Sequence, residues 1–183
     1  MPGKKVESFR SYRLRVLEYL GDRDPMAVLA RTAARLETLS AGRLRRALVR
    51  GPGPGKWSAA EILGHLADAE LAFGWRVRSM LAEPRVQLPA FDQDRWATVG
   101  RYATRDPRTS LELFRVLRRS TLALLRRQAP REWRRHVADH ELRGRLTLTE
   151  LVRLEAAHDL NHLRQLAALL HRPVRGSRDP ARS

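Results

Sequence analysis

Three histidines have the residue type and the spacing to bind one metal ion. His158 and His162 are four residues apart in a segment of helical periodicity, so their imidazoles project from nearly the same face, one turn apart. Two imidazoles so placed can chelate a divalent ion with little rearrangement. His65 lies beside the apolar stripe of an earlier expected helix and could face the same point. Three imidazoles leave positions open on an ion for water or substrate, which is the pattern of a catalytic site.

The spacing alone leaves a second interpretation open, in which the three histidines are separate residues of the core. His158 and His162 both lie on or beside the apolar stripe that contains Leu151, Leu154 and Leu166. A buried imidazole needs a polar partner, and a metal ion is one candidate for that partner.

Several classes of protein are excluded by missing residues. The chain has no cysteine, which excludes disulfides, thiolate zinc fingers, iron–sulfur clusters and cysteine nucleophiles. There is no H-E-x-x-H motif of zinc proteases, and the Gly-Pro stretch at 51–55 lacks the Gly-Lys-Ser/Thr ending of a phosphate-binding loop. The first residues contain no apolar stretch of signal-peptide length, and no window approaches a membrane span. We therefore expect a soluble cytoplasmic protein.

The strong positive charge is a weak guide to function. The chain of 183 residues has 36 Lys and Arg against 20 Asp and Glu, a net charge of +16. Only Lys4, Lys5 and Lys56 are lysines, and a bias toward Arg, Ala and Leu is what GC-rich codons produce. The arginines are spread along the chain without a zinc finger, leucine zipper or RNA-binding aromatic motif. We expect no specific nucleic-acid partner, although non-specific adhesion to polyanions at low salt follows from the charge itself.

The elements that must position the histidines are helices. Apolar residues recur at helical spacing, and few segments alternate with period two. Asp-Pro pairs at 24–25 and 106–107 each open a long helix, and capping boxes start two more, at Ser58 with Glu61 and at Thr147 with Glu150. The last helix runs to about Leu170. We expect a loop at 84–89, an ordered segment at 91–96, and an irregular stretch at 133–145 with a hairpin near Gly144.

Four long amphipathic helices predict an all-α protein, an up-down four-helix bundle with a long connection between the second and third helices. A length of 183 residues fits one domain. We place the bundle at 24–172, after a basic extension at 1–23 that contains a short helix from Ser8 to Leu20. The polar residues 173–183 are expected to form a disordered tail.

Four sequence blocks resemble the DinB-like (DinB/YfiT) superfamily. They are residues 56–70 (KWSAAEILGHLADAE), 91–96 (FDQDRW), 147–152 (TLTELV) and 157–165 (AHDLNHLRQ). The blocks occur in the family's order at sensible separations, and the resemblance covers about residues 24–170. It implies a four-helix bundle, commonly a homodimer, with a divalent metal held by His65, His158 and His162, which are the three histidines that the helical spacing selects.

The resemblance also implies an activity. Characterised members of the superfamily include transferases and isomerases that depend on a low-molecular-weight thiol: bacillithiol, mycothiol or glutathione. The implied cofactors are a divalent metal, zinc or nickel first, and such a thiol, which loses its proton when a metal coordinates it. The family name refers to a gene induced by DNA damage and does not imply DNA binding.

Six further residues are candidates for supporting roles at the site. Asp68, Asp159 and Asn161 flank the histidines and are candidates to orient the rings; Asp68 could equally pair with an arginine, and the other two could be solvent-exposed. Guanidinium groups beside aromatic rings could bind an anionic substrate or thiol. The candidates for substrate binding are Arg76, Asp92 and Trp96.

The sequence leaves three functions in competition. The first is a metal-dependent enzyme, a thiol S-transferase or a related isomerase that acts on a small molecule. The second is a non-enzymatic basic helical protein that binds nucleic acid or another polyanion. The third is a bundle in which a metal on the histidines only stabilises the fold.

Overall fold

The computed structural model describes residues 9–42, 45–53 and 55–170. Its four long helices are α2 (Pro25–Ser40), α4 (Ala59–Ala82), α6 (Pro107–Arg126) and α7 (Leu148–Leu170). The shorter helical elements are α1 (Phe9–Leu20), α3 (Arg45–Val49), α5 (Gln93–Val99) and the 3-10 turn η1 (Pro130–Arg134). Three strands of four residues complete the described part: β1 (Arg85–Leu88), β2 (Val137–His140) and β3 (Gly144–Thr147).

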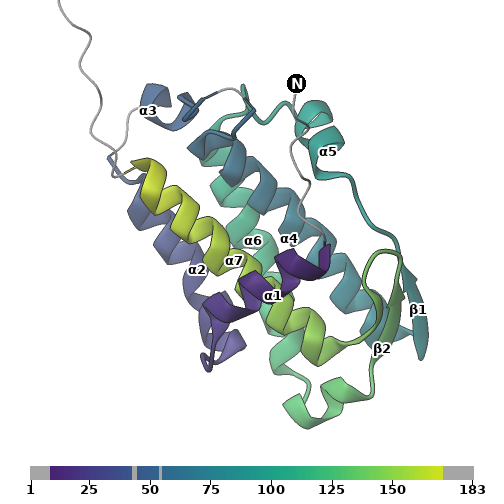
Figure 1. Cartoon of the computed structure of the whole chain (residues 1–183). Coiled ribbons are helices and arrows are strands. Elements are labelled where there is room, and N and C mark those ends of the chain that lie inside the picture. Colours follow the sequence, from purple (N-terminus) through teal and green to yellow (C-terminus); the bar gives the residue numbers. More distant parts are fainter. Residues whose placement is uncertain (1–8, 43–44, 54, 171–183) are drawn as a thin grey trace, which may run out of the picture.

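The four long helices form the predicted bundle (Figure 1). α4 packs against α6 and α7, and α2 packs against the same two helices. The order around the bundle is therefore α2, α6, α4, α7. The all-helical fold class and the long connection between the second and third long helices are confirmed, and α1, the short helix expected in the extension, packs on α7.

One detail of the predicted up-down order differs, because α4 and α6 run in the same direction. Glu70 of α4 bonds Arg118 of α6, and Gly74, one turn further along α4, lies against Thr121, further along α6. The connection at 83–106 includes β1 and α5 and returns to the end of the bundle where α4 begins (Figure 1). A short loop would have made the two helices antiparallel neighbours, whereas this long crossover makes them parallel.

The helix starts follow the capping residues in the sequence. The Asp24 side chain accepts hydrogen bonds from two backbone amides in the first turn of α2, and the Asp106 side chain accepts one from the amide of Arg108 in α6. Ser58 and Glu61 form the predicted capping box of α4. Thr147 Oγ1 accepts from the amide of Glu150, whose carboxylate accepts from the amide of Thr147, so α7 also begins with a capping box. These bonds fix where α4 and α7 begin, and hence the height of the histidines along each helix.

The small sheet lies partly where the sequence predicted a loop. β1 pairs in parallel with β2, and β2 pairs antiparallel with β3. The prediction of a loop at 84–89 was wrong, because β1 has only two inward residues, Val86 and Leu88, and its partner strand lies some fifty residues later. The expected hairpin near Gly144 is present, with Gly144 in the left-handed region at φ 67°, which glycine adopts without strain.

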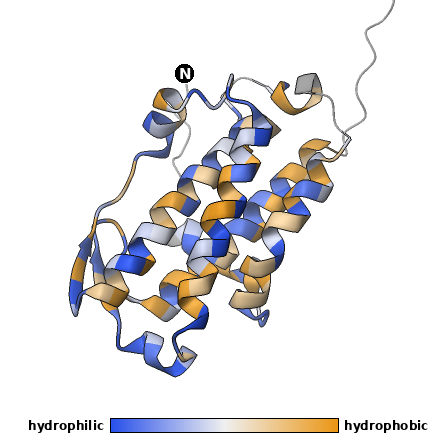
Figure 2. Ribbon diagram, turned by 180° about the vertical axis from the view of Figure 1, so that it is seen from behind, coloured by the Kyte–Doolittle hydropathy of each residue, from blue (hydrophilic) through white to orange (hydrophobic). Residues whose placement is uncertain are grey.

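The core lies between the helices. Apolar and polar residues alternate around each long helix (Figure 2), and all four helices contribute buried apolar side chains to one cluster. No helix in the described ranges is long and apolar enough to cross a membrane. The expected tail at 173–183, the first eight residues of the extension and the start of the short helix at Ser8 lie outside the described residues.

Gly64 of α4 permits the close approach of Tyr102. A Cβ atom on Gly64 would lie 2.9 Å from Cγ of Tyr102, which is well inside van der Waals contact. Tyr102 is only 1% exposed, and its hydroxyl donates to Asp68 Oδ2 at 2.7 Å. The burial of the ring and the hydrogen bond of its hydroxyl thus prevent Tyr102 from moving aside.

We expect Gly64→Ala to lower the free energy of unfolding by about 1–3 kcal/mol through overpacking, even though alanine is the better helix former by about 1 kcal/mol. Urea denaturation measures the change. In a Tyr102→Ala background the same substitution should be neutral or stabilising, because the overlap is gone. An equal loss in both backgrounds would contradict the role assigned to this contact.

Candidate metal centre

The three histidines selected from the sequence meet at the interface of α4 and α7. His65 lies on α4, and His158 and His162 lie one turn apart on α7. The Nε2 atoms of His65 and His158 are 3.0 Å apart, and the three ring centroids lie between 4.5 and 5.1 Å from one another. One ring nitrogen from each histidine lies within 4.8 Å of the other two. The fold therefore brings together three nitrogen donors that are far apart in the sequence.

Burial keeps these imidazoles neutral. His65 is 3% exposed and His162 7% exposed. Burial, assisted by the nearby His162, lowers the pKa of His65 to about 3. Burial also lowers the pKa of His158 and of His162 well below the usual value, with a further contribution from a neighbouring histidine in each case. A neutral imidazole has a lone pair on one ring nitrogen, which is the form that binds a metal.

Polar groups beside the Nδ1 atoms favour Nε2 as the ligand atom on α7. Nδ1 of His162 donates to Oε1 of Gln165 at 2.9 Å, so the proton of the neutral ring is on Nδ1 and the lone pair on Nε2. Nδ1 of His158 lies 3.8 Å from Oε1 of Glu155, which is too long for a hydrogen bond but favours a proton on the same nitrogen. Gln165 and Glu155 were missed by the sequence analysis, although each is three residues from a histidine on the same helix face.

The donor set fits a divalent metal ion. Imidazole nitrogens 2.0–2.1 Å from a tetrahedral zinc ion lie about 3.4 Å apart, close to the 3.0 Å between Nε2 of His65 and Nε2 of His158. Without an ion, one hydrogen bond can link two of the converging ring nitrogens, but the same proton cannot also bond the third nitrogen. Imidazole suits zinc, copper, iron and nickel, so these residues would accept the metals expected from the sequence.

Asp68 has no described hydrogen bond or ion pair with the three histidines. Its Oδ2 accepts from the hydroxyl of Tyr102 at 2.7 Å, and its Oδ1 pairs with Arg105 at 3.2 Å. The pairing with an arginine is the alternative that the sequence left open for this residue. In the structure Asp68 ties α4 to the segment that precedes α6.

Asp159 and Asn161 are both buried rather than exposed to solvent. Asn161 Oδ1 accepts from Arg15 of α1 at 3.2 Å, and both oxygens of Asp159 accept from Arg118. Neither side chain has a described hydrogen bond to a histidine ring. Their bonds instead join α7 to its neighbouring helices, so any effect on the rings acts through the position of α7.

Arg118 forms a buried ionic network that the sequence analysis missed. This α6 side chain is 2% exposed and donates to Glu70 at 2.7 Å, to Asp159 at 2.6 Å and to the carbonyl of Leu29 at 3.1 Å. Glu155 lies 4.0 Å away. Burial alone would lower the pKa of Arg118, but Asp159 and Glu70 outweigh it and raise that pKa. The guanidinium thus stays charged and joins all four long helices.

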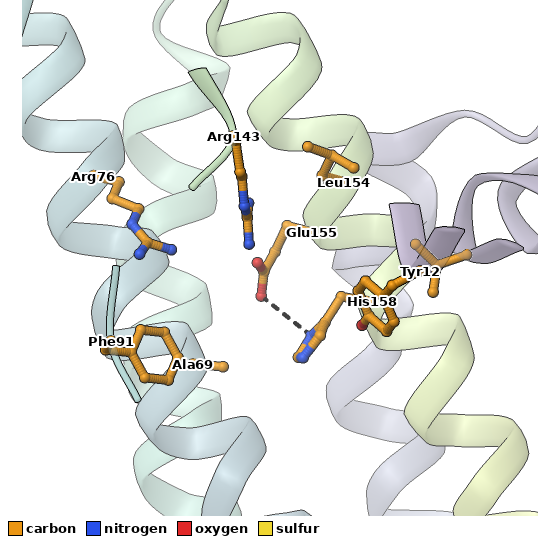
Figure 3. A pocket seen from close by; sticks show the side chains of 9 residues that line it. Tyr12, Ala69, Arg76, Phe91, Arg143, Leu154, Glu155 and His158 are labelled. Atoms are coloured by element: carbon orange, nitrogen blue, oxygen red, sulfur yellow. Dashed lines mark ion pairs between the residues drawn. The ribbon is translucent and has the colours of Figure 1, made fainter. Parts of the chain in front are cut away.

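A cavity of about 50 Å³ lies beside His158 (Figure 3). Its lining includes Arg76, Arg143 and Glu155, and the dashed line in the figure joins Glu155 to His158. Arg76 is the one residue of the three predicted substrate-binding candidates that lines it. The other two candidates lie in the connection at 83–106 with separate roles, Asp92 as the cap of α5 and Trp96 in contact with Phe91, whose ring centroid is 4.6 Å away.

We expect Arg118→Met to lower the free energy of unfolding by about 3–5 kcal/mol, because Glu70 and Asp159 would stay buried without their cation. Chemical denaturation measures the loss. The matched control is Arg119→Met, which removes the neighbouring, exposed arginine and should change stability by less than about 0.5 kcal/mol. Equal effects of the two substitutions would contradict the network.

We expect Gln165→Ala to weaken zinc affinity by about 10- to 100-fold, because His162 loses the acceptor that fixes its tautomer and orientation. Competition with a chromogenic chelator measures the affinity. Gln87→Ala removes an exposed glutamine of β1 and should leave zinc affinity unchanged. Unaltered affinity in Gln165→Ala would show that His162 is oriented by other contacts.

Comparison with known proteins gives the family. The model of the DinB superfamily matches residues 27–166. YfiT of Bacillus subtilis, named as a predicted metal-dependent hydrolase, is 25% identical over 118 residues, which are 64% of this chain and 66% of that protein. GK0616 of Geobacillus kaustophilus carries the same designation and is 28% identical over 118 residues, with 64% and 66% covered. The match thus spans just under two thirds of the length of these curated relatives.

A solved structure supports the fold. The structure of YfiT from Bacillus subtilis, described as a four-helix bundle of unusual topology, has a TM-score of 0.72 to this chain at 21% identity, and the match covers 92% of this chain and 90% of that one. Because the family model matches more than half of the sequence, this protein belongs to the DinB superfamily.

Proposed function

We propose that this protein is a divalent-metal-dependent hydrolase whose three histidines, His65, His158 and His162, hold the ion. The observation that carries the proposal is the convergence of three neutral ring nitrogens beside a cavity, with one nitrogen of each ring within 4.8 Å of the others. Three protein ligands leave coordination positions for water and substrate. The names of the related proteins, which class them as predicted metal-dependent hydrolases, favour water as the nucleophile.

The residues of the chain supply binding and orientation. An ion bound there would act as a Lewis acid and lower the pKa of a nucleophile in contact with it. Gln165 holds His162, and Glu155 favours the same tautomer in His158. The Arg118 network fixes α4 and α7 relative to each other, so the donors need little rearrangement.

The sequence resemblance favours a second nucleophile, a low-molecular-weight thiol in place of water. The same donor set would serve both reactions, because a metal lowers the pKa of a thiol as it does that of water. The thiol S-transferase or isomerase activity, the homodimer and the cytoplasmic location remain predictions from the sequence.

We expect zinc- or nickel-loaded protein to hydrolyse an activated ester such as p-nitrophenyl acetate, with turnover at least about 100-fold lower in His65→Ala. Gln87→Ala should retain full activity. Addition of bacillithiol or glutathione with an electrophilic acceptor tests the thiol reaction in the same preparation. Hydrolysis that is equal in His65→Ala and the parent protein, with circular dichroism showing that both are folded, would contradict a metal-dependent reaction at this site.

A further inference from the structure

The cavity beside His158 has a cationic wall. Arg76 reaches it from α4 and Arg143 from the turn between β2 and β3, and both guanidinium groups point toward Glu155 (Figure 3). Two guanidinium groups therefore face the one carboxylate among the lining residues. Glu155 is also 4.0 Å from Arg118 and 3.8 Å from His158, so this single carboxyl group is not the partner of Arg76 alone.

Arg76 is buried without a matching anion of its own. The residue is 5% exposed, and its Nη2 donates to the carbonyl of Pro89 at 3.0 Å. Within the described residues its Nε has no hydrogen-bond partner and its guanidinium forms no ion pair. Burial, with repulsion from Arg143, lowers the pKa of Arg76 to about 10, so the group remains charged at neutral pH.

Such an arrangement is costly unless a ligand completes it. A buried cation without a paired anion destabilises the fold, whereas an oxyanion in the cavity would supply both the missing charge and an acceptor for the Nε–H of Arg76. The planar guanidinium can donate to both oxygens of a carboxylate at once. The cavity of about 50 Å³ is large enough for a group of three or four water-sized atoms, since one water needs about 10–15 Å³ on such a measure.

We propose that Arg76 binds a carboxylate group of the substrate in the cavity beside His158, with Arg143 adding positive charge, and that the protein therefore selects small carboxylate-bearing molecules. That the bound molecule is a substrate rests on the proposed function, whereas the binding of a carboxylate at Arg76 does not. Since His158 lines the same cavity, the rest of a molecule anchored there would extend toward the three histidines. The carboxylate thus acts as a specificity element and takes no part in bond cleavage.

Propionate is the probe, and its dissociation constant is measured by ligand-observed NMR on the full chain, once treated with chelator and once loaded with zinc. The metal-free sample separates binding at Arg76 from ligation of an ion. We expect Arg76→Met to weaken propionate at least about 10-fold in both samples, and Arg76→Lys to weaken it less, because lysine keeps the charge and loses the planar fork. Arg145→Met, which removes an exposed arginine of β3 that is not among the residues lining the cavity, should have no effect.

A neutral probe and a differently shaped anion test whether the site selects a carboxylate. Propionamide, which has the same shape without the charge, should bind at least about 10-fold more weakly than propionate. Equal propionate affinity in Arg76→Met and Arg145→Met, no propionate binding to the parent chain, or tighter binding of inorganic phosphate would each overturn the carboxylate site. If circular dichroism shows that Arg76→Met is unfolded, the effect of Arg143→Met on propionate affinity and the comparison with propionamide still test the carboxylate site.

The two proposals fail in different ways. Loss of ester hydrolysis with intact, Arg76-dependent propionate binding would refute the hydrolase and leave the carboxylate site standing. Metal-dependent hydrolysis with propionate binding that is unchanged by Arg76→Met would support the hydrolase and refute the carboxylate site.

Discussion

One buried guanidinium fixes the geometry on which the candidate site depends. Arg118 of α6 bonds Glu70 of α4, Asp159 of α7 and the backbone of α2. Asp159 is the residue after His158, and Glu70 lies little more than one turn beyond His65. A charge network that is nearly free of solvent has few alternative arrangements, because any shift leaves a buried group unpaired. The network therefore sets how α4 and α7 meet, and with it the distance between the histidines that they carry.

The candidate site divides into a neutral part and a charged part. The three imidazoles are neutral because burial lowers their pKa values, so they present lone pairs to an ion. The adjoining cavity has two arginines and one carboxylate among its lining residues. A divalent ion would add positive charge to a cavity that already carries an excess of it. Such a centre is suited to an anionic ligand, and the charge that matters there comes from Arg76 and Arg143 rather than from the net charge of +16 of the whole chain.

The parts of the fold that depend on local sequence could be predicted, and those that depend on distant partners could not. The capping boxes at Ser58 and Thr147 mark helix starts because their bonds span only three residues. The three histidines were found because helical periodicity aligns two of them and an apolar stripe places the third nearby. β1 was missed because the strand with which it pairs, β2, lies far along the chain. The parallel direction of α4 and α6 was missed because it depends on the path of the connection between them.

The supporting groups show the same division. Gln165 and Glu155 lie three residues from a histidine and could have been found from helical spacing. Arg118 could not be distinguished by sequence from the other arginines, since only the packed bundle shows that it is buried between two carboxylates. Asp159 was selected for its position beside His158, but its partner is that arginine and not a histidine.

The metal content of the protein tests the central claim most directly. Inductively coupled plasma mass spectrometry on tag-free protein, incubated with zinc or nickel and then desalted, measures the ions per chain in the parent protein and in His158→Ala. A three-histidine centre predicts about one ion per chain in the parent and a loss of that ion in folded His158→Ala. No retained ion in the parent protein, or equal retention in the variant, would contradict the assignment of these histidines as a metal centre.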